Sequence, residues 1–262
     1  MKILFLGDIV GKSGREMVKK HLQEILKKYQ IDFVIANGEN ATHGKGLIEH
    51  HYHQLLEAGV DCITLGNHYN AKNEISQYIN GADSLIRPYN LKTDFPGVGT
   101  AVFEVDSYRI RVTNLLGTAF MLEEVENPFD ALKKILDTEE KTEIHIVDFH
   151  AETTSEKQAL GWAFDGQVTA VIGTHTHVQT HDERILKQGT GFMCDAGMCG
   201  PHNGILGADR EAMIQRVWHH EKVNYALEKE KGSILQGVVM EVDPEQGIVT
   251  KMKSISLFDE HI

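Results

Sequence analysis

The sequence has only three cysteines among its 262 residues, namely Cys62, Cys194 and Cys199. They are too few and too scattered for a disulfide framework, and Cys194 and Cys199 lack the paired spacing of a zinc knuckle. Free thiols that serve packing are typical of proteins kept in a reducing compartment. We therefore expect a cytoplasmic protein whose three cysteines lie in its core.

Long apolar runs are also missing, which excludes a helix that spans a bilayer. The first eight residues contain one lysine and a short apolar run, and Asp8 ends that run at once. This pattern predicts a first β-strand rather than a signal peptide. We expect no membrane partner.

Positive charge is scarce, because 26 Lys and Arg stand against 38 Asp and Glu and give a formal net charge of −12. Proteins that bind long nucleic acid usually present basic stripes, so stable binding of this kind is not expected. A small phosphate ester bound by metal ions is still compatible with this charge, since the ions supply positive charge themselves. The composition leaves assembly into a homo-oligomer open.

The hydrophobic periodicity of the first 80 residues indicates alternating strands and helices. The predicted strands are 2–7, 33–36 and 62–65, and the predicted helices are 13–29, 48–58 and 73–79. This βαβαβα order is typical of a parallel sheet with covering helices.

The remainder of the chain is richer in strands. Residues 100–105 and 108–114 predict a hairpin, strands follow at 144–149 and 170–173, helices are predicted at 129–136, 153–163 and 210–218, and the later strands have an antiparallel pattern. No repeat, low-complexity tract or linker interrupts the sequence, so we expect residues 1–262 to form a single domain with two sheets and outer helices.

Five apolar runs end in side chains that can bind a metal ion. In chain order these side chains are Asp8, Glu39 with Asn40, Asn67 with His68, His150, and the pair His175 and His177. Convergence at the carboxyl ends of strands is typical of an open α/β active site. Carboxylate, amide and imidazole groups suit Mn²⁺, Fe²⁺ or Zn²⁺.

The pair His175 and His177 follows directly on an apolar run. In extended backbone, side chains two residues apart lie on the same face, so we expect both imidazoles to point the same way and to bind a metal together. Each group taken alone has an ordinary alternative: Asp8 as an acid at a helix N-terminus, Asn67-His68 as a cap, and the histidine pair as surface residues. The repetition at five strand ends favours a metal site.

A phosphate-binding loop is a weaker interpretation of the segment from Gly7 to Ser13. That motif needs four residues between its two glycines, whereas three separate Gly7 from Gly11. A nucleotide triphosphatase is therefore a poor alternative.

The order of these motifs resembles that of the calcineurin-like metallophosphoesterases. The matching segments are Gly7-Asp8, Gly38-Glu39-Asn40, Gly66-Asn67-His68, His150 and Gly173-Thr174-His175-Thr176-His177. The longer segments around them resemble the YmdB-like branch over essentially the whole chain. The resemblance implies an α/β fold, a four-layer α-β-β-α sandwich of two mixed sheets flanked by helices.

The chain departs from the wider superfamily at Val10, where a histidine is usual, and at Glu39, which replaces an aspartate. Both departures are features of the branch. Tyr69 and Asn70 stand where we expect Trp and Asp, which affects packing or substrate contact close to the site.

The resemblance also implies an activity, hydrolysis of 2′,3′-cyclic nucleotides by a metal-bound hydroxide at a centre of two divalent ions. Iron or manganese is expected there, with zinc or magnesium as alternatives. One ion would be bound by Asp8, Glu39, Asn40 and His177, and the other by Glu39, Asn67, His150 and His175. His68 would be the general acid, while the roles of His43 and Lys45 stay open. The alternatives are a phosphomonoesterase on the same fold and a metal-dependent nucleotide-sensing regulatory protein.

Overall fold

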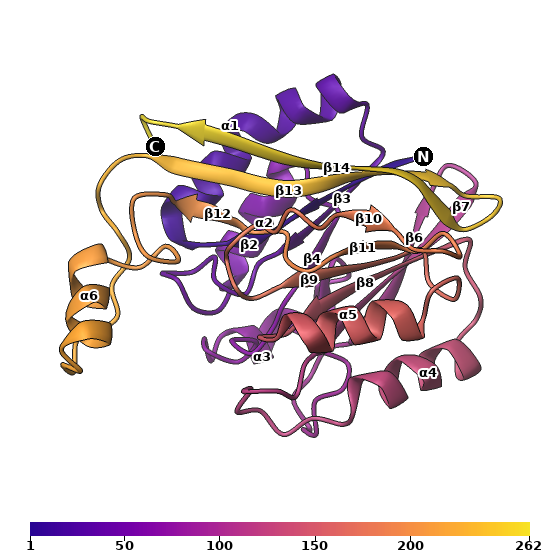
Figure 1. Ribbon diagram of the computed structural model, residues 1–262, viewed down its shortest axis with the longest axis horizontal. Coiled ribbons are helices and arrows are strands. Elements are labelled where there is room, and N and C mark those ends of the chain that lie inside the picture. The colour runs from indigo at the N-terminus through magenta and orange to yellow at the C-terminus, as the bar shows by residue number, and fades with distance from the viewer.

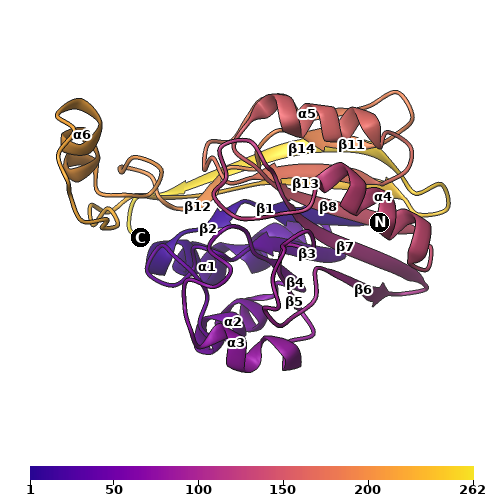
Figure 2. The same ribbon diagram turned by 90° about the horizontal axis from the view of Figure 1, so that it is seen from below.

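The structure, a computed structural model that describes residues 1–262, contains two β-sheets packed face to face (Figures 1 and 2). The first sheet has the strand order β2 (Asp8–Ile9), β12 (Met198–Pro201), β13 (Ser233–Asp243), β1 (Lys2–Leu6), β3 (Phe33–Asn37), β4 (Cys62–Thr64) and β5 (Leu85–Ile86), and β14 (Ile248–Asp259) pairs with β13. The second has the order β10 (Arg184–Ile185), β11 (Gly191–Met193), β9 (Ala170–Thr174), β8 (Ile144–His150), β7 (Tyr108–Leu116) and β6 (Thr100–Val105).

Helices cover the outer face of each sheet (Figure 2). The first sheet is covered by α1 (Gly11–Tyr29), α2 (Glu49–Ala58) and α3 (Ile75–Tyr78), and the second by α4 (Pro128–Thr138) and α5 (Thr154–Ala163). The predicted four-layer sandwich of two mixed sheets is confirmed. A sixth helix, α6 (Arg210–Trp218), has no buried residue and stands away from the sheets (Figure 1).

Strand β1 shows why the layers form. Ile3 and Phe5 pack into the core between the two sheets, whereas Leu4 and Leu6 pack into the core beneath the helices of the first sheet. Because side chains alternate along a strand, a strand that is covered on both faces must be apolar throughout, as this run is.

The strands that carry the candidate residues run parallel within each sheet. β1, β3 and β4 are parallel neighbours in the first sheet, and β8 and β9 are parallel neighbours in the second. Within the first sheet their carboxyl ends lie at one edge, as the βαβαβα pattern predicts. Contacts of His150 with Glu39 and Asn67 show that the carboxyl end of β8 lies at the same edge. No helix combines the length and the apolar composition that crossing a bilayer requires.

Two details differ from the sequence-based expectations. The helix predicted at 73–79 is shorter, because α3 ends at Tyr78 and a 3-10 helix (Ile79–Gly81) follows. The expectation that the later strands are antiparallel holds for β13 and β14 but is wrong for β11, which runs parallel to β9. The connection through β10 brings the chain back to the starting end of β9, so β11 enters the sheet in the same direction.

Candidate metal centre

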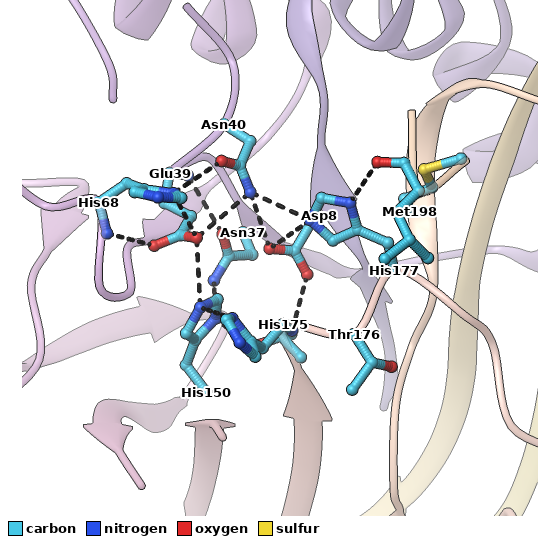
Figure 3. Close-up of polar contacts among 12 residues, drawn as sticks. Asp8, Asn37, Glu39, Asn40, His68, His150, His175, Thr176, His177 and Met198 are labelled. Atoms are coloured by element: carbon cyan, nitrogen blue, oxygen red, sulfur yellow. Dashed lines mark hydrogen bonds and ion pairs between the residues drawn. The ribbon is translucent and has the colours of Figure 1, made fainter. Parts of the chain in front are cut away.

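The structure brings all seven predicted metal ligands and His68 together at the edge where the two sheets meet. Figure 3 labels all of these residues except Asn67. The first sheet contributes the residues that follow β1, β3 and β4, and the second contributes the end of β8 and the loop after β9. These residues are Asp8, Glu39, Asn40, Asn67, His68, His150, His175 and His177.

One half of the cluster is centred on His150. Its Nε2 atom lies 3.2 Å from Glu39 Oε1, 3.1 Å from Asn67 Oδ1 and 3.0 Å from His175 Nδ1. One donor atom each from Glu39, His150 and His175 lies within 4.8 Å of the others. This spacing suits a single bound metal ion.

The other half is centred on Asn40 and Asp8. The side-chain amide nitrogen of Asn40 lies 3.3 Å from Asp8 Oδ1, 3.1 Å from His177 Nε2 and 3.2 Å from Glu39 Oε1. The same Oε1 atom of Glu39 contacts His150, so this carboxylate lies between the two halves (Figure 3). Two hydrogens on one amide cannot satisfy three such neighbours, and turning the amide oxygen toward them would suit a cation.

The outer nitrogens of two histidines are held by acceptors. His177 Nδ1 donates to the carbonyl of Leu206 at 2.9 Å, and His175 Nε2 lies 3.0 Å from a carboxylate oxygen of Glu152. A ring that donates through its outer nitrogen turns an unprotonated inner nitrogen into the cluster, which is the arrangement of metal-binding histidines.

His150 has the same arrangement through a longer chain. Its Nδ1 atom lies 2.9 Å from the hydroxyl of Thr174, and that hydroxyl donates to Asp148 at 2.7 Å. Since the Thr174 hydrogen is already used, Nδ1 is the donor to Thr174 and Nε2 carries the inward lone pair. With the rings neutral, these imidazole nitrogens and the carboxylates of Asp8 and Glu39 turn lone pairs toward one another, which a divalent cation would satisfy.

The buried charges of the cluster also favour a bound cation. Asp8 and Glu39 are buried at 0% and 1% exposure, and no lysine or arginine pairs with either. Burial disfavours the charged form of Glu39, yet the charge and hydrogen bond of His150 hold the pKa of its carboxyl well below the usual range. Burial opposes charge on His150 and His177 as well, but the neighbouring carboxylates raise the pKa of each to about 9. Without a bound cation, protons on these two rings therefore balance the carboxylates, and a metal ion would take the place of those protons. The site requires positive charge.

The prediction that His175 and His177 lie in extended backbone is wrong. Both follow the end of β9, with φ angles of +101° and +63°. The turn sends His175 toward His150 and His177 toward Asp8, so the two imidazoles serve opposite halves of the cluster (Figure 3).

His68 borders the cluster differently from the other histidines. Its Nδ1 atom lies 3.0 Å from Asn40 Oδ1 and 3.2 Å from Glu39 Oε1, and its backbone N–H donates to Glu39 at 2.9 Å. No hydrogen bond engages Nε2. The residue lines a cavity of about 420 Å³ that adjoins the cluster, and Lys45 lines it as well. His43 is exposed and does not line it.

The sequence reasoning missed several supporting residues. Asp148 is fully buried and stands two residues before His150 on β8, so the period of a strand could have placed both on one face. Glu152, which orients His175, lies two residues after His150. The buried pair Lys157 and Asp195 comes from α5 and from the loop after β11, and no local pattern indicates their contact.

A family model described as YmdB-like protein matches residues 4–255. The chain belongs to the YmdB-like family. It is 44% identical to the 2′,3′-cyclic-nucleotide 2′-phosphodiesterase of Bacillus subtilis, over 100% of this chain and 99% of that protein.

Solved structures agree with this placement. A crystal structure described as a novel phosphatase from Mycoplasma pneumoniae has a TM-score of 0.94 and 44% identity. The match covers 100% of this chain and 94% of the Mycoplasma chain. The calcineurin-like phosphoesterase YfkN of Bacillus subtilis has a TM-score of 0.58 at 13% identity, covers 98% and 90% of the two chains, and shows the shared fold alone. The expected resemblance to YmdB-like metallophosphoesterases is confirmed, and this family implies divalent metal ions.

Proposed function

We propose that this chain hydrolyses 2′,3′-cyclic nucleotides at a centre of two divalent metal ions. The observation that carries the proposal is the pair of inward-facing donor groups that share Glu39 (Figure 3). The name of the Bacillus subtilis relative supports the substrate class and indicates that the bond to the 2′ oxygen is broken.

The donor set assigns residues to each ion. Asp8, Asn40 and His177 would hold one ion and Asn67, His150 and His175 the other, with Glu39 between them. Such ions supply positive charge for the phosphoryl oxygens and lower the pKa of water. Nitrogen and oxygen donors without cysteine suit iron or manganese first, and zinc or magnesium second.

His68 is the proposed general acid. Its Nδ1 is held by Asn40 and Glu39, which fixes the ring and leaves Nε2 directed away from these contacts. When water adds to phosphorus and the bond to O2′ breaks, a proton from Nε2 would neutralise the departing oxygen and leave a nucleoside 3′-phosphate.

The same assignment covers the whole chain. We propose that residues 1–262 form one domain, because both sheets contribute to the core between them and to the cluster. The three cysteines are free and buried, in keeping with the proposed cytoplasmic location.

Hydrolysis of phosphate monoesters is a second candidate function, favoured by the description of the Mycoplasma pneumoniae structure as a phosphatase. Rates with p-nitrophenyl phosphate and with bis-p-nitrophenyl phosphate separate the two candidates. A diesterase cleaves the bis ester faster, and the reverse order would establish the monoesterase.

The deciding experiment measures metal content and hydrolysis of 2′,3′-cyclic AMP in the wild type, in Glu39→Gln and in the control Glu57→Gln, whose carboxylate is exposed on α2. We expect two metals per chain in the wild type and in the control, and loss of both metal and activity in Glu39→Gln. Full activity without metal would overturn the proposal.

A further inference from the structure

The cavity beside the metal centre has a wall that the proposed chemistry does not use. Besides His68, Glu39 and the histidine loop, it is lined by Tyr225, Lys45 and two side chains of α6, Met213 and Arg216. Its volume of about 420 Å³ falls within the range of sites that enclose small-molecule ligands.

Tyr225 is fixed in this wall by the backbone on its C-terminal side. Ala226 accepts a hydrogen bond from the N–H of Asp209 at 2.8 Å, and Leu227 forms a β-bridge with Ala208. The partner segment begins just after Leu206, whose carbonyl binds His177. The position of the ring is therefore tied to one half of the metal centre.

The ring of Tyr225 is tied to the other half through Gly44. A Cβ atom on Gly44 would meet the Cε1 and hydroxyl atoms of Tyr225 at 2.9 Å, so the ring packs directly on this glycine. Gly44 belongs to the loop that carries Glu39 and Asn40. An aromatic ring that is 43% exposed is thus held next to the centre from two sides.

Helix α6 supports the same interpretation. None of its residues is buried, so it adds nothing to the cores, yet Met213 and Arg216 face the cavity. The Nζ atom of Lys45, an exposed side chain, lies over the Tyr225 ring in a cation–π contact, 5.3 Å from its centre. The wall thus combines a flat aromatic surface, an adaptable apolar side chain and two positive charges.

We propose that Tyr225 is the platform on which the nucleobase of the substrate stacks, with Lys45 and Arg216 as the charges that attract its phosphate. This inference rests on the proposed function and names the part of the chain that selects nucleotides over other cyclic phosphodiesters. Stacking accepts every base because each has an aromatic face, so the enzyme discriminates weakly among bases.

The test compares 2′,3′-cyclic AMP with glycerol 1,2-cyclic phosphate, which has the strained diester but no base. Stacking on one aromatic side chain is worth about 1–3 kcal/mol per base, which corresponds to roughly a 5- to 150-fold change in affinity. We expect Tyr225→Ala to raise KM for the nucleotide by a factor within this range. Its kcat, its metal content and its kinetic constants with the base-free substrate should equal those of the wild type. Tyr225→Phe keeps the ring and should behave as the wild type.

Two further variants sharpen the result. Tyr108→Ala removes a tyrosine at the start of β7, outside the cavity, and should leave KM for both substrates unchanged. Lys45→Ala removes a positive charge but keeps the Tyr225 ring, so it should raise KM for both substrates by the same factor.

A binding measurement makes the inference independent of turnover. Calorimetric titration with 3′-AMP and with inorganic phosphate should show that Tyr225→Ala lowers the affinity for 3′-AMP and leaves the affinity for phosphate unchanged. If Tyr225→Ala lowered the affinity for both ligands equally, or for neither of them, the inference would be overturned. If the wild type cleaves neither cyclic substrate, the proposed function fails, and the titration alone decides the role of Tyr225.

Discussion

Lys157 and Asp195 form an ion pair at 2.9 Å, with both side chains 1% exposed, directly beneath the loop that carries His175 and His177. Lys157 also donates to the carbonyl of Thr174 at 2.8 Å, and Asp195 accepts from the N–H of Thr176 at 3.0 Å. The pair therefore holds the backbone on both sides of His175, a residue whose φ of +101° is costly by about 1–3 kcal/mol. A buried charge pair thus maintains the turn that separates the two histidines.

We expect Lys157→Met to destabilise the protein and to weaken metal binding. Removing the lysine leaves the Asp195 charge buried and unpaired, which costs about 3–5 kcal/mol in the free energy of unfolding. Urea unfolding and competitive metal titration measure the two effects.

The control for this variant is Lys133→Met on α4, where the ion pair with Asp137 at 3.0 Å is exposed. Exposed pairs contribute about 0–1 kcal/mol, so stability should change little and metal binding not at all. Equal effects in the two variants would contradict a positioning role for Lys157.

His68→Ala should keep both metals and lower kcat for 2′,3′-cyclic AMP by about 10²- to 10⁴-fold, the usual contribution of a general acid. The loss should be smaller with bis-p-nitrophenyl phosphate, because p-nitrophenolate leaves without needing a proton. Steady-state rates with both substrates check this, and His53→Ala, an exposed histidine of α2, is the control. Full turnover in His68→Ala would remove this residue from the mechanism.

Gly66→Ala should abolish metal binding while leaving a folded protein. A Cβ atom at this position would overlap the carboxylate of Glu39 and the ring of His150, so the two halves could not keep their spacing. Gly81→Ala is the matched control, since nothing lies within 4 Å of its added Cβ. Metal analysis gives the metal content of each variant, and circular dichroism shows whether it is folded. Retention of both metals in Gly66→Ala would refute the packing argument.

His145 makes the fold sensitive to acid. Burial, and then the charge of Arg111, lower its pKa from 6.5 to about 3, and its Nε2 atom lies 2.8 Å from the hydroxyl of Thr113. The folded state thus disfavours the protonated ring. Its contribution to stability is complete above pH 6.5 and is lost as the pH falls from 6.5 toward 3, by up to about 1.4 kcal/mol per pH unit.

His145→Gln should therefore show a shallower loss of unfolding free energy between pH 6 and pH 4 than the wild type. Urea unfolding at pH 7, 6, 5 and 4 gives the two slopes. Parallel slopes would show that His145 does not cause the acid sensitivity.

The sequence determined the layers and the identity of the candidate ligands. Alternation along a doubly covered strand explains why Ile3 and Phe5 enter one core and Leu4 and Leu6 another. Because parallel strands end at a common edge, side chains that directly follow such strands, as Glu39 and Asn67 do, are brought together whatever the details of the loops.

Only the tertiary structure decided the backbone geometry that sends His175 and His177 to opposite halves of the cluster. The backbone turn at His175 depends on Lys157 and Asp195, which are 38 positions apart in sequence and meet only when α5 packs against the end of β11. The position of Tyr225 likewise depends on its contact with Gly44, far away in the chain. Local periodicity reports which face of a strand or helix is buried, but it holds no information about contacts between such distant segments, and these contacts complete the site.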